Sequence, residues 1–415
     1  MLQIQSCVAV AVLATTLHAA DLLTLDQALD LAERNHPQLQ AGSAQVDLAA
    51  AGIITAKAYP NPESALLAGR QTATIPIELG GPIPGTSYFY SFSQPLELGA
   101  LRPTRVQLAQ RGRESSEFAL SEIRLGVLSA VRRAFYQVLH RKREIQLAGE
   151  RLRMVEDLRR RIQVRVDVGE AGRLELLRAD AEAAIARTLA NSAQLQLVTA
   201  LSQFRAAVAA PLAPDIDLQG EFDATVQVPP LDELRREVLE RHPSLALGQS
   251  EVRRADARID YELALRRPQP LLRTEIDLNP GSPNYRVGIG IPMPFWNRRE
   301  GPIAEAAAAR RQTDRLAQAQ RIEILASLEG AYGRYQVARQ QISAYEQGVL
   351  READQALQGA ETAYQLGERG IIEVLDAQRV LHTVRFDYLT AQYERQQAMI
   401  DIDQLRAIQL RRPIP

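Results

Sequence analysis

The residues of this chain best suited to chemistry are two carboxylates beside a glycine-rich turn. Glu373 and Asp376 are three residues apart in a segment of good helix formers, so a helix would present both on one face. Repeated around a pore, such carboxylates would favour cations and repel anions. The alternative is a solvated helix end, where exposed charge pairs contribute about 0–1 kcal/mol. The residues alone favour the solvated helix end, and a pore remains the alternative interpretation.

Catalysis and metal binding find little support elsewhere in the chain. No Ser/His/Asp or Cys/His arrangement stands out, and no GxxxxGK[ST] loop is present. His36 and His242 each precede a proline between two helical stretches, and we expect both to be structural. The other histidines and the methionines form no cluster with zinc- or copper-type spacing. The sequence therefore predicts no enzyme, no metal site and no cofactor.

The net charge and the first twenty residues indicate which partners and which compartment to expect. The formal net charge is −1, which gives no reason to expect a nucleic acid partner. Residues 1–20 are predicted to be a secretory signal peptide, with a short apolar run and then Ala19 and Ala20 before Asp21. Cys7 precedes that run, a position that argues against a lipid anchor. Cleavage would leave no cysteine, which suits an oxidising compartment.

An internal duplication organises the rest of the chain. VGEAGRLELLRA at 168–179 recurs as LGERGIIEVLDA at 366–377, about 198 residues later. The openings of the halves also match, including the His36-Pro37 and His242-Pro243 steps. Short solenoid repeats recur every 20–50 or so residues, so this period indicates a duplicated half-protein. We expect one pseudo-symmetric body made of residues 21–220 and 221–415.

Two long helical hairpins are predicted where proline is absent. No proline lies between Pro103 and Pro211, or between Pro302 and Pro413, and both segments are rich in good helix formers. Their apolar residues follow a 3-4 spacing, in seams such as the one that ends at Tyr364, which indicates coiled-coil packing. One Gly-x-x-Gly element interrupts each segment and suits a sharp reversal. The hairpins should cover about 100–208 and 300–410, with tips at 168–174 and 366–372.

Four short strands are predicted between the helices, at about 63–71, 87–96, 270–279 and 285–293. In the third, apolar residues alternate with Arg273, Glu275 and Asp277, which gives the strand one apolar and one polar face. A transmembrane barrel needs about eight or more strands with closed edges. A membrane protein would therefore have to be an oligomer. The alternative is a soluble periplasmic coiled-coil scaffold with ordinary sheet edges.

Together these segments resemble the TolC-type outer-membrane efflux factor family, across nearly the whole mature chain. The similarity is carried by LTLDQALDLAERNHPQL at 23–39, YPNPE at 59–63 and the two tips, of which GERGIIEVLDAQ at 367–378 is the most specific. QPLELGALRPTRV at 94–106 and IPMPFWNRREGPIAEA at 291–306 look most like the cation-efflux branch, the CzcC and CusC type.

The resemblance implies a mainly α fold with β structure, in which four strands per protomer contribute to a trimeric transmembrane barrel and long helical hairpins form a periplasmic tunnel. Arg273, Glu275 and Asp277 would face the pore. The protein would be an outer-membrane exit duct that passively conducts substrates, heavy-metal cations in this branch. Its partners would be two further copies, a periplasmic adaptor, an inner-membrane transporter of the RND type and outer-membrane lipid. Ducts of multidrug or type I protein-secretion systems are the alternative within the family.

The resemblance also implies roles for residues at the tips. The adaptor-docking residues would be Val168, Gly169, Gly172, Leu366, Gly367 and Gly370. The periplasmic gate would be formed by Glu175, Arg369, Glu373 and Asp376, with Arg369 paired to Glu175. The family's aspartates at two of these positions are glutamates here, which leaves the shape of the constriction open.

Overall fold

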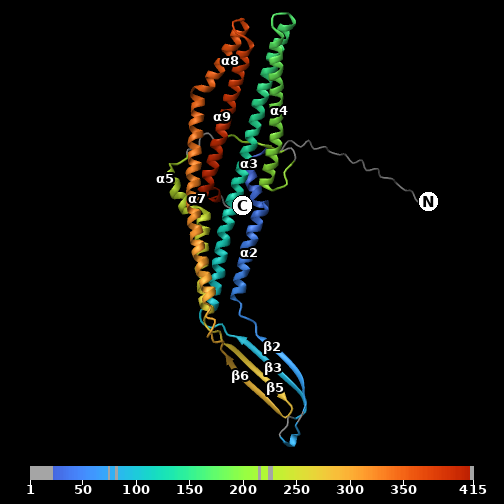
Figure 1. The fold of residues 1–415 in the computed structure, drawn as a ribbon, viewed down its shortest axis with the longest axis vertical. Coiled ribbons are helices and arrows are strands. Elements are labelled where there is room, and N and C mark those ends of the chain that lie inside the picture. The colour runs from blue at the N-terminus through green and yellow to red at the C-terminus, as the bar shows by residue number, and fades with distance from the viewer. Residues whose placement is uncertain (1–21, 73–74, 80–82, 214–215, 223–227, 412–415) are drawn as a thin grey trace, which may run out of the picture.

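The chain is an elongated helical body with a sheet at one end and two helical tips at the other (Figure 1). This computed structural model describes residues 22–72, 75–79, 83–213, 216–222 and 228–411. The predicted signal peptide and Cys7 lie outside the described residues. Among the described helices, none combines the length and the apolar composition needed to cross a membrane.

The helices of the two halves follow the same order. In the first half they are α1 (Leu25–Asn35), α2 (Pro37–Lys57), α3 (Leu101–Asp167) and α4 (Arg173–Val208). In the second half they are α5 (Leu231–Arg241), α6 (Pro243–Leu265), α7 (Glu300–Ala344), α8 (Leu350–Gln365) and α9 (Ile371–Leu405). A π-helical turn, Tyr345–Val349, joins α7 to α8 and has no counterpart in α3. The long mainly helical architecture in two halves is confirmed.

The long helices lie side by side as a wall whose members change along its length. α3 contacts α2 and α6 toward the sheet, and α4 and α9 toward the tips, while α7 contacts both α6 and α9. The largest apolar cluster lies near the middle of the body, where Phe135 of α3 meets Phe204 of α4 edge to face. Alanines fill many buried positions of α4, so these helices approach closely.

Each half begins with the same histidine joint between two helices. His36 ends α1 and caps α2, and His242 ends α5 and caps α6. In both, Nδ1 accepts the N–H of the second residue of the new helix at 3.2 Å, while proline occupies the first helical position and has no N–H to satisfy. The expected structural role of both His-Pro steps is confirmed.

The four longer strands form one antiparallel sheet that combines both halves. They are β2 (Glu63–Gln71), β3 (Gly85–Pro95), β5 (Leu271–Asn279) and β6 (Ser282–Gly290), in the order β2-β3-β5-β6. The first hairpin meets the second through β3 and β5. A separate parallel ribbon of β1 (Leu22–Leu23) and β4 (Asp217–Leu218) is fastened to α3 by Lys142, which donates to Asp217 and to the Leu218 carbonyl. The four predicted strands of the antiparallel sheet are confirmed, and the short ribbon of β1 and β4 is an addition.

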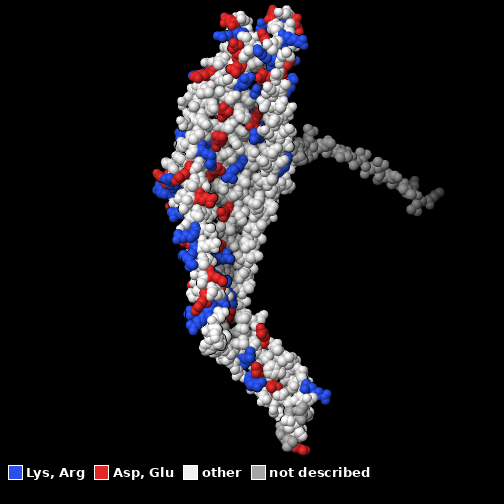
Figure 2. Space-filling model, viewed as in Figure 1, with Lys and Arg blue, Asp and Glu red and all other residues white. Residues whose placement is uncertain are grey.

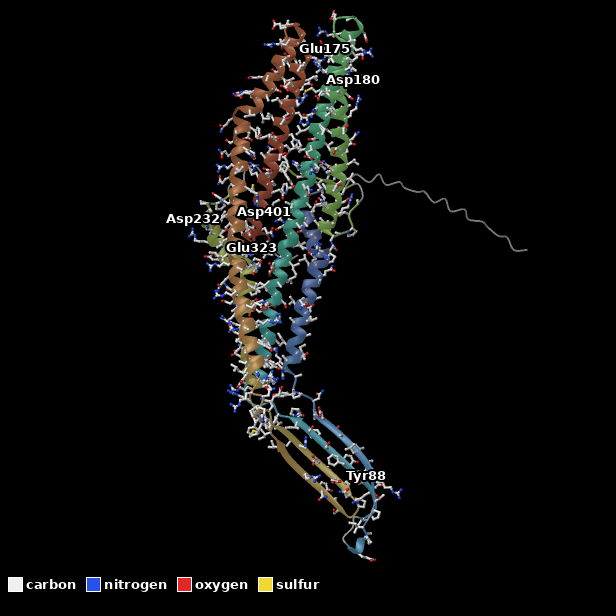
Figure 3. The ribbon with its side chains drawn as sticks, viewed as in Figure 1. Tyr88, Glu175, Asp180, Asp232, Glu323 and Asp401 are labelled. Atoms are coloured by element: carbon white, nitrogen blue, oxygen red, sulfur yellow. The ribbon has the colours of Figure 1, made fainter. Side chains whose placement is uncertain are left out.

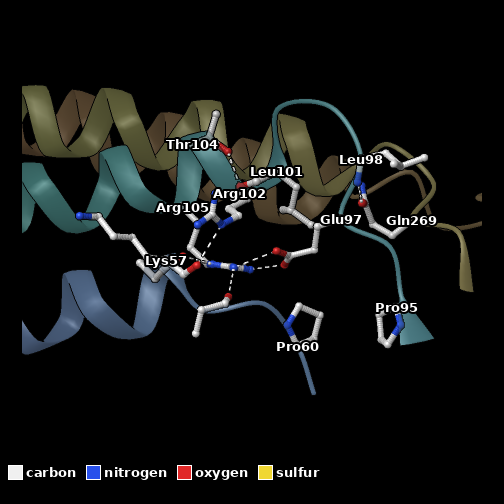
Figure 4. A network of polar contacts seen from close by, with 12 residues as sticks. Lys57, Pro60, Pro95, Glu97, Leu98, Leu101, Arg102, Thr104, Arg105 and Gln269 are labelled. Atoms are coloured by element: carbon white, nitrogen blue, oxygen red, sulfur yellow. Dashed lines mark hydrogen bonds and ion pairs between the residues drawn. The ribbon is translucent and has the colours of Figure 1, made fainter. Parts of the chain in front are cut away.

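Arg105 joins the sheet end to the helices (Figure 4). Its guanidinium donates to the carbonyls of Ala56 and Ala58 at 2.9 and 2.8 Å, and to both carboxylate oxygens of Glu97. One planar fork therefore connects the end of α2, the segment after β3 and the start of α3. In the second half, the buried Glu262 near the end of α6 binds Arg299, which lies just before α7.

Candidate functional site

Both tips turn with the same backbone motif. Gly169 and Gly367 follow the helix C-caps with φ values of 82° and 75°. In each tip the glycine N–H donates to the carbonyl three residues earlier at 3.1 Å, and the next N–H donates to the carbonyl five residues earlier. This is the Schellman motif, which needs a residue in the left-handed region. Glycine is therefore strongly favoured at both positions.

The second glycine of each tip is not required by the backbone. Gly172 and Gly370 cap α4 and α9 with φ values of −81° and −85°, which any residue adopts. In the described structure a Cβ on Gly172 would meet nothing within 4 Å, and one on Gly370 would meet Glu373 Oε2 at 3.5 Å. Exposed apolar side chains lie nearby, with Val168 65% and Leu366 70% exposed. Each tip thus presents a bare backbone beside an apolar side chain.

Glu175 lies near the tip of the first hairpin (Figure 3). It connects that hairpin to the second one through a hydrogen bond. It lies in the first turn of α4, where the helix dipole favours a negative charge. Its Oε2 accepts a hydrogen bond from the Tyr364 hydroxyl of α8 at 3.1 Å. The Arg165 guanidinium lies 4.9 Å from the Tyr364 ring centre. Burial, and then the charge of Glu175, raises the pKa of Tyr364. Sequence reasoning placed Tyr364 only in an apolar seam, because periodicity does not report a hydroxyl's partner.

The other three predicted gate residues belong to the second tip. Among the described residues, the Arg369 side chain has no hydrogen-bond or ion-pair partner, so its predicted pairing with Glu175 is not formed within one chain. Glu373 lies in the first turn of α9, and the exposed Asp376 is 3.7 Å from Arg379. An Arg369 contact with a neighbouring copy stays a prediction.

One face of the sheet is apolar across all four strands. The register places Leu66, Tyr90, Ile276 and Tyr285 in one row. Large exposed side chains of this face and of the corner that follows are Leu66, Tyr88, Tyr90, Phe92, Tyr285, Val287, Ile289, Phe295 and Trp296. Trp296 is 96% exposed at the corner between β6 and α7. Exposed apolar faces of this extent mark contact with lipid or protein, and aromatic residues favour the interface between lipid and water.

The opposite face of the sheet is polar. Arg273, Glu275 and Asp277 lie on it together, opposite Ser93, Ser91 and Phe89 of β3. Arg286 of β6 lies directly opposite Glu275 on the same face. The sequence pattern predicts Arg273, Glu275 and Asp277 as pore-facing residues and places Arg286 on the polar side of its own strand; the register sets Arg286 against Glu275.

The buried histidines take part in packing and helix capping. His140 stacks on Tyr393 with ring centres 4.3 Å apart, and burial lowers the pKa of His140 and of His242. His242 Nδ1 is already used as a helix cap. Within the part of the chain that the structure describes, no three His, Cys, Asp or Glu side chains are grouped to hold a metal ion.

Comparison with known proteins explains this combination of a two-faced sheet and distant tips. The family model "Outer membrane efflux protein" matches residues 28–210 and 234–407. The chain is 27% identical to the cobalt-zinc-cadmium resistance protein CzcC of Cupriavidus metallidurans, over 93% of this chain and 90% of that one. It is 26% identical to the pyoverdine export outer membrane protein OpmQ of Pseudomonas putida, over 92% and 83%.

Solved structures show the same fold. The structure of CusC matches with a TM-score of 0.78 at 19% identity, covering 92% of this chain and 91% of that one. The outer-membrane channel OprN matches with a TM-score of 0.80 at 16% identity, covering 92% and 89%. The resemblance to TolC-type efflux factors is thereby confirmed. The chain belongs to the outer membrane efflux protein family, whose members are efflux channels and not enzymes, with a helical portion that extends into the periplasm.

Proposed function

We propose that three copies of this chain form one exit duct, with the sheets closed into a barrel of about twelve strands. The observation that carries this proposal is the sheet itself, whose β2 and β6 are open edges and whose large apolar face is exposed. Unpaired strand edges cannot be left in lipid, so each edge needs a neighbouring copy. Family channels form trimers in tripartite pumps. In a closed ring of three such sheets, β2 of each copy can pair with β6 of its neighbour, so no strand edge is left unpaired.

The sides of the body support the same assembly. Figure 2 shows charged side chains concentrated at the tips and along one edge, with a largely uncharged surface over α2 and much of α4. α2 carries only two charged residues, Asp47 and Lys57, and residues 188–204 of α4 carry none. This edge suits burial against a second copy. The mature protein should purify as a trimer in detergent, and a monodisperse soluble monomer would overturn the barrel.

We infer heavy-metal cations as the cargo class. The support is the similarity to the cobalt-zinc-cadmium resistance protein along almost the full length of both chains. The similarity to a pyoverdine export protein favours a second candidate, the export of an organic molecule. Deleting the gene and measuring tolerance to Co²⁺, Zn²⁺ and Cd²⁺, together with siderophore secretion, separates the two. Unchanged metal tolerance with reduced secretion would contradict the metal assignment.

We also propose that the tips dock a periplasmic adaptor, which links the duct to an inner-membrane transporter of the RND type. The support is the bare backbone at Gly172 and Gly370 beside the exposed Val168 and Leu366. Because both tips have the same surface, Val168→Ser and Leu366→Ser should each weaken efflux, and the double variant should abolish it. The amount of outer-membrane trimer should not change. Full efflux by the double variant would exclude docking through these residues.

A gate near the same tips completes the proposal. Glu175, Arg369, Glu373 and Asp376 lie at or beside the two turns, and the Arg369 guanidinium is available for a carboxylate of a neighbouring copy. Arg369→Ser should therefore raise the single-channel conductance of purified protein in planar bilayers. Neutralising Glu373 and Asp376 should lower the preference for cations. Parental conductance and selectivity in both variants would mean that these charges are only a solvated helix end.

A further inference from the structure

The register of the sheet places two arginines beside the carboxylates of the polar face. Arg286 of β6 is directly opposite Glu275 of β5. Its guanidinium nitrogens lie 3.3 Å from a Glu275 oxygen and 3.9 Å from an Asp277 oxygen. Arg273 lies 4.0 Å from the same Glu275. The two carboxylates are therefore flanked by two guanidinium groups.

The exposed fractions show which charges project from the sheet. The Glu275 and Asp277 side chains are each 24% exposed, whereas the Arg286 side chain is 59% and the Arg273 side chain 58% exposed. The carboxylates lie close to the backbone, and the longer arginines extend above them. An ion passing this face would meet the guanidinium groups first.

The net charge of the polar face depends strongly on Arg286. The register assigns three carboxylates to the described strands on this face, Glu63, Glu275 and Asp277, and two guanidiniums, Arg273 and Arg286. The face thus carries one net negative charge per chain. Losing Arg286 would double that charge, and losing Glu275 and Asp277 would reverse its sign. The charges on the polar face of the sheet therefore nearly cancel, and the face is not strongly acidic.

We propose that Arg286 is a selectivity-determining residue of the duct, which holds the cation preference of the barrel low so that charge selection is left to the tips. This inference rests on the proposed trimeric barrel with the polar face toward the lumen. In that barrel three copies of Arg286 form a ring beside rings of Glu275 and Asp277. Fixed charges of one sign that line a pore favour ions of the opposite sign, and Arg286 reduces that bias.

The size of the effect follows from three charges in screened water. At about 10 Å from an ion, and with a Debye length of about 10 Å at 0.1 M salt, removing three positive charges changes cation and anion partition by about twofold each, in opposite directions. Arg286→Gln should therefore raise the K⁺ to Cl⁻ permeability ratio about fourfold. The reversal potential of purified channels in a KCl gradient measures this ratio directly.

Three variants separate charge from structure. Arg70→Gln removes the same charge from the opposite face of the same sheet and should leave the ratio unchanged. Arg286→Lys keeps the charge and should behave like the parent. The double variant Glu275→Gln, Asp277→Asn should shift the ratio toward Cl⁻, and this arm stands even where Arg286→Gln yields no trimer.

The outcomes distinguish this inference from the proposed function. If the parent protein forms no conducting trimer, the barrel itself fails. If the parent conducts but Arg286→Gln and the double variant both keep its reversal potential, the role of Arg286 is wrong. If Arg286→Lys shifts the ratio as much as Arg286→Gln, the effect belongs to packing and the inference is likewise overturned.

Discussion

Arg105 is the residue whose loss we expect to weaken the sheet end of the helical body most. Its guanidinium holds two backbone carbonyls and the Glu97 carboxylate at once (Figure 4). The Glu97 side chain is only 7% exposed, so water cannot readily replace the guanidinium. Arg105→Ala would leave a buried carboxylate without its counterion.

The magnitude follows from burial on the two sides of the pair. Removing one partner of a buried ion pair costs about 3–5 kcal/mol. The Arg105 side chain is 25% exposed, so some water can enter and the low end applies, about 3 kcal/mol. Arg113→Ala is a matched control on the same helix. Its partner Glu117 is half exposed, and such pairs contribute about 0–1 kcal/mol.

Urea unfolding of the purified protein in detergent, followed by helical circular dichroism, measures both free energies. Arg105→Ala should unfold at clearly lower urea than Arg113→Ala. Arg105→Lys should recover only part of the loss, because an ammonium group cannot match the bidentate geometry. Adding Glu97→Gln to Arg105→Ala should restore part of the lost stability, because it removes the unpaired charge but does not replace the donors to Ala56 and Ala58. Equal midpoints for the two alanine variants would refute the argument.

Three further predictions concern the repeat joints and the tips. Burial lowers the pKa of His242, so the unfolded chain binds a proton at this histidine more readily than the folded chain does. The free energy of unfolding should therefore be highest above the ordinary histidine pKa of about 6.5 and should fall below it, by up to about 1.4 kcal/mol per pH unit, until the lowered pKa is passed. His242→Asn should keep the helix cap and flatten the pH profile of urea unfolding. Gly367→Ala should cost roughly 1–2 kcal/mol in the same assay because φ is positive. Gly370→Ala should cost less, about 0.5 kcal/mol, because φ is negative there and the only loss is that alanine is a poorer N-cap than glycine. Tyr364→Phe removes the hydrogen bond to Glu175, so its single-channel conductance in planar bilayers should exceed that of the parent; equal conductance would mean that this contact does not hold the gate.

Local patterns were enough to predict the long helices, their reversals and the four strands of the antiparallel sheet. Proline-free segments located the long hairpins, and the paired Gly-x-x-Gly elements located both reversals, because left-handed backbone after a helix is a local requirement of the chain. Alternation of apolar and charged residues in β5 predicted its two faces, because successive side chains of a strand point to opposite sides of the sheet. The π-helical turn at Tyr345–Val349 was not predicted, because such a turn interrupts helical bonding without a proline to mark it.

Contacts between distant residues were decided only by the tertiary structure. The amino-acid order shows that Glu175 and Tyr364 both lie near tips, but not that they bond, since 189 residues separate them. Likewise the alternation in β6 places Arg286 on a polar face, and only the register with β5 sets it against Glu275 and Asp277. Periodicity determines which way a side chain points along its own element. Which charge it meets depends on how two elements align, and that alignment is fixed by packing across the whole body.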